Sequence, residues 1–141
     1  MSDQWKYQLR ITMPKPMAEI ARSDQDDPAL KPLTDILNQH SARLRNQLDA
    51  FTDYVAWAEA NGEQDSTLCK WTRATIEKPD KQARYKKVFT IHVDGDEVYD
   101  AARADPLEHD LQPLVGGTLV DGMTRHDTNP ANNPQAPRKY R

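Results

Sequence analysis

The chain has 141 residues, of which 37% are hydrophobic and 29% are charged, and its formal net charge is −3 at pH 7. This length suits one domain with a single, lean hydrophobic core. The slight negative charge excludes the strongly basic composition of a general nucleic-acid or membrane-surface binder.

The cysteine content and the apolar runs predict where the protein resides. Cys69 is the one cysteine, so an internal disulfide is impossible, which is typical of a reducing compartment. The opening residues MSDQWKYQ form no apolar signal region, and no run reaches the roughly 18 apolar residues of a membrane span. We therefore expect a soluble, cytoplasmic protein that does not contact membranes.

Residues 5–13, WKYQLRITM, alternate between apolar and polar side chains. Because successive side chains of a strand point to opposite faces, this pattern predicts a half-buried strand. Its polar face holds Lys6, Gln8, Arg10 and Thr12. Residues 14–28 are expected to form a connection that contains at most one helical turn.

Residues 32–60 carry apolar side chains at steps of three, four and seven, which predicts one long amphipathic helix. Such a helix measures about 43 Å, whereas a nine-residue strand spans about 30 Å. The helix must therefore either overhang the sheet or break near residues 38–41. An overhang exposes four apolar residues, which the 14–28 connection, the second helix or another chain could cover. Another chain would most simply form a twofold homodimer. These interface candidates are Phe51, Tyr54, Val55 and Trp57.

Residues 68–77 and 84–94 are rich in β-branched and aromatic side chains, which predicts two strands. The intervening KPDKQA contains a Pro-Asp turn signal, so the two strands are expected to form a hairpin. In the second strand Tyr85, Phe89, Ile91 and Val93 are assigned to the core face. For the first strand, the pattern leaves open which face is buried.

Residues 94–105, DGDEVYDAARAD, predict a second, shorter helix capped by Asp94 or Asp96. A weak strand follows over 118–125, and 127–141 is expected to be a disordered tail after a domain of residues 1–126. The element order is that of an α+β, ferredoxin-like (split βαβ) fold, with an antiparallel sheet and one long and one short helix on one face.

Motifs for metal or cofactor chemistry are incomplete. Asp94 and Asp96 match the start of a calcium loop, but Tyr99 and Asp105 stand where that loop needs glycine and glutamate. The four histidines show no zinc spacing. We therefore expect no metal and no cofactor, and we interpret Cys69 as a buried structural residue.

The remaining candidate is the sheet face opposite the core. It collects basic and aromatic residues if Trp71 turns toward it, although a plain solvated sheet looks similar. The candidate binding residues are Lys6, Arg10, Trp71, Arg73, Lys86 and His92.

These residues predict a binding or interaction protein without catalysis, whose partner is an unidentified protein or a second copy of the chain. One alternative is an enzyme of the dimeric α+β-barrel kind, with a pocket on the sheet face and His92 as acid–base residue. A second is an RRM-type binder of single-stranded RNA, which the acidic composition disfavours. Fold alone does not decide among them.

Overall fold

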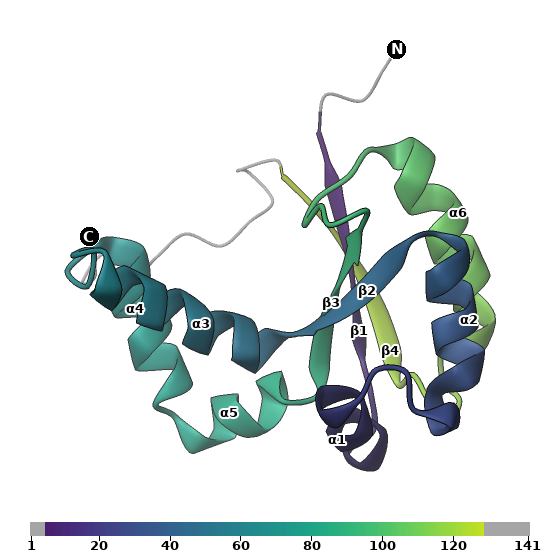
Figure 1. The fold of residues 1–141 in the computed structure, drawn as a ribbon, viewed down its shortest axis with the longest axis horizontal. Helices are drawn as coiled ribbons and strands as arrows, with labels where there is room; N and C mark the ends of the chain where they lie inside the picture. The colour runs from purple at the N-terminus through teal and green to yellow at the C-terminus, as the bar shows by residue number, and fades with distance from the viewer. Residues whose placement is uncertain (1–4, 129–141) are drawn as a thin grey trace.

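The computed structural model describes residues 5–128. Its elements in chain order are β1 (Tyr7–Thr12), α1 (Lys15–Ser23), η1 (Pro28–Leu30), α2 (Lys31–Gln39), β2 (Ala42–Asn46), α3 (Gln47–Ala60), α4 (Thr67–Ile76), α5 (Pro79–Tyr85), β3 (Val88–Val93), α6 (Ala101–Leu111), η2 (Gln112–Leu114) and β4 (Gly122–Asp127). The four strands form one antiparallel sheet in the order β2-β3-β1-β4, with helices on both sides of it (Figure 1). The protein is therefore α+β.

The strand predicted over residues 5–13 is confirmed as β1, with Leu9 and Ile11 buried and Arg10 on the opposite face. β1 pairs with β3 and β4, and β2 pairs with the far side of β3. We call the face of Leu9 and Ile11 the core face and the opposite one the outer face. Outer-face residues on the two central strands are Gln8, Arg10, Thr12, Val88, Thr90 and His92.

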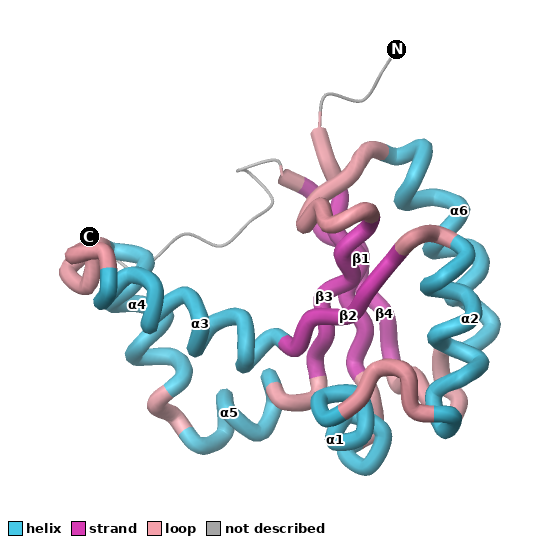
Figure 2. The backbone as a smooth tube through the Cα atoms, in the orientation of Figure 1, coloured by secondary structure: helices cyan, strands magenta, loops and turns pink. Residues whose placement is uncertain are grey.

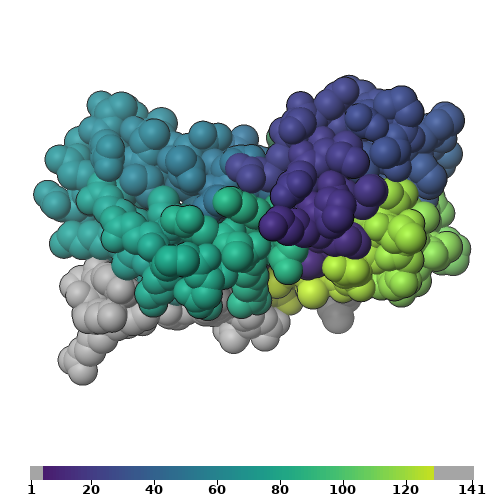
Figure 3. All heavy atoms as spheres, turned by 90° about the horizontal axis from the view of Figure 1, so that it is seen from below, coloured from purple at the N-terminus to yellow at the C-terminus, as the bar shows by residue number. Residues whose placement is uncertain are grey.

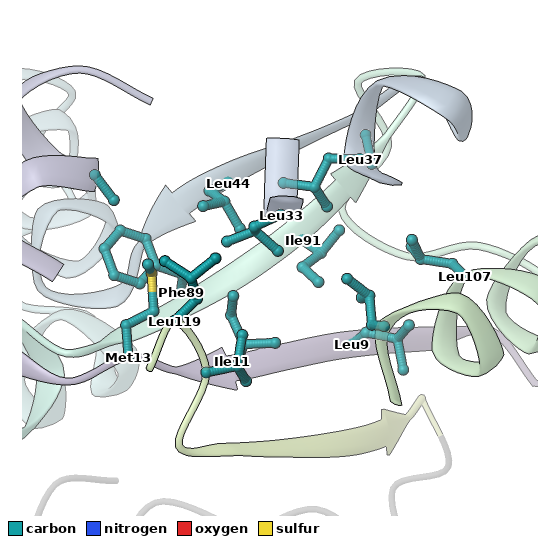
Figure 4. Close-up of a cluster of buried hydrophobic side chains, with 14 of the residues drawn as sticks. Leu9, Ile11, Met13, Leu33, Leu37, Leu44, Phe89, Ile91, Leu107 and Leu119 are labelled. Carbon is teal, nitrogen blue, oxygen red and sulfur yellow. The ribbon is translucent and has the colours of Figure 1, made fainter. Parts of the chain in front are cut away.

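Helices α1, α2 and α6 cover the core face. Leucines from α2 and α6, including Leu33 and Leu107, meet Leu9 and Ile91 of the sheet in one buried cluster (Figure 4). Tyr99 lies inside this cluster, where its hydroxyl accepts from Leu9 N at 2.9 Å and donates to the Ile91 carbonyl at 2.9 Å. The sheet and these three helices therefore form the main core.

The prediction of one continuous helix over residues 32–60 is wrong. The helix breaks near residues 38–41, the position given as the alternative to an overhang. α2 ends at Gln39, and β2 follows before α3 begins. In β2 the side chains of Ala42 and Leu44 are buried while those of Arg43 and Arg45 are exposed. This period of two does not by itself indicate a strand, because Leu44 also fits the helical spacing of the neighbouring apolar residues. The overhang inferred from the helix length therefore does not exist.

The strand predicted over residues 68–77 is also wrong, because these residues form α4. The Ser66 hydroxyl accepts from Cys69 N at 3.2 Å and caps this helix. Cys69 and Thr72 are buried at helical spacing, so the β-branched composition is overridden by packing. KPDKQA begins α5 with Pro79 in its first turn, and the predicted hairpin is absent from the described residues.

Helices α3, α4 and α5, residues 47–85, form a unit between β2 and β3 that we call the helical arm. Val55, Ala58 and Cys69 make its small buried cluster, which is separate from the main core. The arm lies on the side of the sheet away from α2 and α6 (Figure 2). The expectation that the helices share one face is therefore wrong.

The ends of other elements differ from their predicted positions. Residues 15–23 form a full helix, α1, where a connection was expected. The second predicted helix, α6, starts later and is capped by Asp100, because Asp94 and Gly95 adopt positive φ angles in a turn. The weak strand is β4, which extends to Asp127, and the remainder of the predicted tail lies outside residues 5–128 apart from Thr128.

Candidate binding groove

A groove separates the outer face of the sheet from the helical arm. It consists of two hollows of about 570 and 560 Å³. Five residues line both hollows, so the hollows adjoin: Arg10, Gln47, Phe51, Leu68 and Thr72. Figure 3 views the molecule from the side of α1 and α5, with the arm beside the half that contains the sheet. The volume is in the range of small-molecule sites.

The floor of the groove is a regular array set by strand register. Arg10 pairs with Thr90 of β3 on one side and with Thr124 of β4 on the other. Thr90 pairs in turn with Arg45 of β2, so one row of polar side chains crosses all four strands. His126 lies opposite Gln8 in the adjacent row.

Arg10, near the middle of this floor, is half-buried. Its Nε donates to Gln8 Oε1 at 2.6 Å, and Gln8 Nε2 donates to the Glu97 carbonyl at 3.1 Å. No carboxylate of residues 5–128 forms an ion pair with Arg10, in contrast to Arg22 or Arg73. Burial lowers the pKa of Arg10, and Glu97 opposes that shift. Arg10 is thus a half-buried cation that forms no ion pair with a carboxylate of residues 5–128.

The two strands beside β1 each carry a histidine on the outer face, His92 on β3 and His126 on β4. The pKa of His126 is lowered, first by burial and then by the charge of Arg10. Burial also lowers the pKa of His92, which Glu97 raises and Arg45 lowers further. Because both shifts run downward from 6.5, the two imidazoles are neutral at pH 7. An anion bound at Arg10 would favour their protonated forms.

The arm supplies the apolar wall. Phe51 of α3 meets the Tyr85 ring edge-on, with 5.1 Å between ring centroids. Trp71 of α4 lines the first hollow and Tyr54 of α3 lines the second. Gln47, at the start of α3, is buried, and no residue of the described chain donates a hydrogen bond to its Oε1.

The structure brings together three of the six predicted binding residues. Arg10, Trp71 and His92 line the groove, although Trp71 comes from a helix and not from a strand. Arg73 instead points to Glu59, with 2.6 Å between Nη2 and Oε1. The other two are exposed and do not line either hollow: Lys6 precedes β1, and Lys86 follows α5.

The four residues predicted for a dimer interface are divided between different surroundings. Phe51 and Tyr54 line the groove, and Val55 is buried against α4. Only Trp57 is largely exposed among them, at 51%, and it stacks on Tyr54 with ring centroids 6.2 Å apart. The helix overhang that motivated the interface is absent, and the homodimer itself stays a prediction.

Sequence reasoning missed Gln47 and His126 as groove residues. His126 lies just beyond the predicted strand of residues 118–125, although Thr124 and His126 alternate with Met123 and Arg125 as a strand requires. Gln47 gave no signal, because it lay within a presumed continuous helix.

The other candidate motifs have local partners. His40 Nε2 lies 2.7 Å from Asp110 Oδ2, at the junction of α2 and α6. Arg103 forms ion pairs with Asp94 at 3.6 Å and Asp96 at 3.3 Å, so the acidic turn is partly neutralised. Cys69 is buried, as predicted. Within residues 5–128, no group of three or more metal-ligating side chains is suitably placed.

Within residues 5–128, no helix has the length and apolar content that crossing a membrane requires. No family model, curated protein or solved structure matches the chain. The groove is therefore the feature from which a function can be inferred.

Proposed function

We propose that this chain is a non-catalytic binding protein whose groove holds a small organic anion. The observation that carries the proposal is Arg10, a half-buried guanidinium without a carboxylate partner among residues 5–128. An unpaired buried charge is costly, and a bound anion would offset that cost. The aromatic wall opposite, with Phe51 and Trp71, favours an anion that carries a flat apolar part.

Two further properties belong to the same proposal. We infer a ferredoxin-like arrangement, supported by the antiparallel order β2-β3-β1-β4 and by α2 and α6 in the β1–β2 and β3–β4 connections. On this view, the helical arm is an insertion between β2 and β3. We also infer a reducing compartment such as the cytoplasm, supported by the free thiol of Cys69.

Neither earlier alternative gains comparable support. A dimeric barrel needs a second sheet against the outer face, and the arm lies on that side (Figure 2). An RRM-type surface stacks bases on aromatic side chains of the central strands. Over residues 7–12 and 88–93, the outer-face side chains include no phenylalanine, tyrosine or tryptophan.

The test replaces Arg10 with methionine. Thermal unfolding is measured with and without inorganic phosphate, adenosine monophosphate and N-acetylphenylalanine. We expect at least one organic anion to raise the melting temperature of the wild type but not that of Arg10→Met. Without ligand, Arg10→Met should melt no lower than the wild type, because the substitution removes a desolvated charge.

The matched control is Arg43→Met. Arg43 lies on β2, is exposed and pairs with Asp26 at 3.1 Å, outside both hollows. It should respond to anions as the wild type does. An equal response of the Arg10 variant, or no response of the wild type to any of the three anions, contradicts the proposed function.

A further inference from the structure

The first hollow of the groove is lined by cations and by no carboxylate of residues 5–128. Arg10 stands on its floor, and two further permanent charges line it, Arg84 of α5 and Lys87 between α5 and β3. Within the described residues, neither Arg84 nor Lys87 forms an ion pair with a carboxylate. Three cations therefore line one hollow without a neutralising side chain.

The second hollow has a different balance of charge. Glu97 lines it, and the charge of this carboxylate opposes the downward pKa shifts of Arg10 and His92. Arg45 also lines the second hollow, but its Nη2 lies 2.9 Å from Asp53 Oδ2. Because Glu97 would repel an anion there, the first hollow is the more favourable position for one.

Backbone hydrogen bonds and strand register fix the position of Lys87. Its N–H donates to the Arg84 carbonyl at 3.1 Å, and its carbonyl accepts from Met13 N at 2.8 Å. The next residue, Val88, pairs with Thr12 of β1, and both of these residues line the first hollow. Lys87 therefore stands on backbone that is bonded to α5 on one side and to the end of β1 on the other.

The helical arm gives the first hollow an apolar wall. Leu68 lines this hollow with 53% of its surface exposed, and the rings of Phe51, Trp71 and Tyr85 line it as well. An apolar group that covered Leu68 would remove apolar surface from water, which is favourable. The first hollow thus combines three cations with an apolar surface that a ligand can cover.

We propose that the first hollow binds a phosphate monoester of a small aromatic or heterocyclic group, with the phosphate among Arg10, Arg84 and Lys87. The ring of the ligand packs against Leu68. This inference rests on the proposed function. A phosphate monoester carries about two negative charges at neutral pH and three strong acceptor oxygens, whereas a carboxylate carries one charge and two oxygens. Three cations are therefore better matched by the phosphate.

The first test changes the charge of the ligand and keeps its shape. Titration calorimetry at about pH 8 compares phenyl phosphate, which is a dianion there, with phenyl sulfate, which has a similar tetrahedral head group and one charge. We expect phenyl phosphate to bind about tenfold more tightly, because more negative acceptors form stronger hydrogen bonds with the cations. Equal affinities would overturn the dianion.

Inorganic phosphate tests the ring in the same experiment. It should bind more weakly than phenyl phosphate, because it leaves Leu68 uncovered. Leu68→Ser should weaken phenyl phosphate and leave inorganic phosphate unchanged. Trp57→Ser is the control, since Trp57 is similarly exposed, at 51%, and lines neither hollow. Equal binding of the two phosphates by the wild type would overturn the role of the apolar wall.

A set of charge variants tests the position of the phosphate. Arg84→Gln/Lys87→Gln should bind phenyl phosphate and phenyl sulfate with similar affinity, and each single variant should lose part of the preference. Arg84 is exposed and Lys87 is half-buried, so thermal unfolding should show that these variants fold. Arg45→Gln is the control, because Arg45 lines only the second hollow, and it should keep the preference. A preference kept in the double variant, or lost in Arg45→Gln, would overturn the first hollow as the phosphate site.

Other ligands separate this inference from the proposed function. Binding of N-acetylphenylalanine through Arg10, without binding of phenyl phosphate, would leave the anion groove intact and overturn the phosphate monoester. A phosphotyrosine peptide that binds more tightly than phenyl phosphate would overturn the small ligand in favour of a protein partner. Anions that bind equally to the wild type and to Arg10→Met would overturn both the inference and the proposed function.

Discussion

The two halves of the molecule are held together very differently. The sheet and its covering helices share a large core in which Leu9, Ile91 and Leu107 are completely buried. The helical arm has only Val55, Ala58 and Cys69 in its buried cluster. Because buried apolar area is the main source of stability, the arm should open at a lower free energy than the sheet. The groove thus has a firm floor and a more yielding wall.

This contrast also separates the roles of the two sides in binding. The charged groups, with Arg10 at their centre, stand on strands whose register is fixed by pairing on both edges. The aromatic groups stand on helices that can move slightly against the floor. We expect the floor to set which anion binds and the wall to adjust to its apolar part.

The largest expected effect is a charge placed in the main core. Ile91→Asp buries an unpaired carboxylate and should cost several kcal/mol of unfolding free energy. Urea unfolding followed by far-UV circular dichroism measures the loss. Wild-type stability in this variant would show that the sheet is not the core described above.

A cavity made by a large-to-small substitution should destabilise the whole protein when it lies in the main core, but only the helical arm when it lies there. Leu107→Ala should cost about 2–5 kcal/mol and lower the global unfolding free energy. Val55→Ala should cost about 2 kcal/mol, mostly as local opening of the arm. Hydrogen exchange should then accelerate in α4 while β3 keeps its protection. Equal acceleration in β3 would mean that arm and sheet unfold as one unit.

Helix caps provide a milder version of the same comparison. Ser66 Oγ accepts from Cys69 N in the arm, and Asp100 Oδ1 accepts from Arg103 N at 3.1 Å beside the main core. Replacing either cap by alanine should cost about 1 kcal/mol. The melting temperature should fall more for Asp100→Ala, and α4 exchange should rise more for Ser66→Ala. The reverse pattern would contradict the lower stability of the arm.

The smallest effect concerns pH. The pKa values of His92 and His126 are lowered in the folded protein, so the unfolded chain takes up protons first as pH falls. Their contribution to stability is therefore complete above about pH 6.5 and declines below it. Melting temperatures between about pH 7.5 and 5.5 should fall less steeply in His92→Gln/His126→Gln than in the wild type. Parallel slopes would rule this contribution out.

Sequence reasoning succeeded where one signal was unopposed. In β1 and β3 the alternation of large apolar with polar residues, as in Leu9, Arg10 and Ile11, has a single structural solution. β2 could not be predicted, because Leu44 satisfies both a period of two and the helical spacing of its neighbours. In α4, residues such as Thr72 and Ile76 favour a strand by composition, whereas contact with α3 stabilises the helix.

The candidate site was predictable only in part for a related reason. Arg10 and His92 follow directly from strand alternation, so their position on the outer face could be derived. The wall could not, because Phe51 and Gln47 reach the groove only through the turn from β2 into α3. Because the boundary between β2 and α3 is not evident in the sequence, the residues that the arm contributes to the groove could not be predicted.

The thiol of Cys69 can report how often the helical arm opens. Its thiol is fully buried between α3 and α4, and it is the one cysteine in the sequence. A maleimide can reach the sulfur only while the two helices are apart, so the labelling rate counts the openings of the arm. A ligand bound against Phe51 would disfavour the separation of the two helices. The labelling rate of Cys69 would therefore fall as the fraction of ligand-bound protein rises.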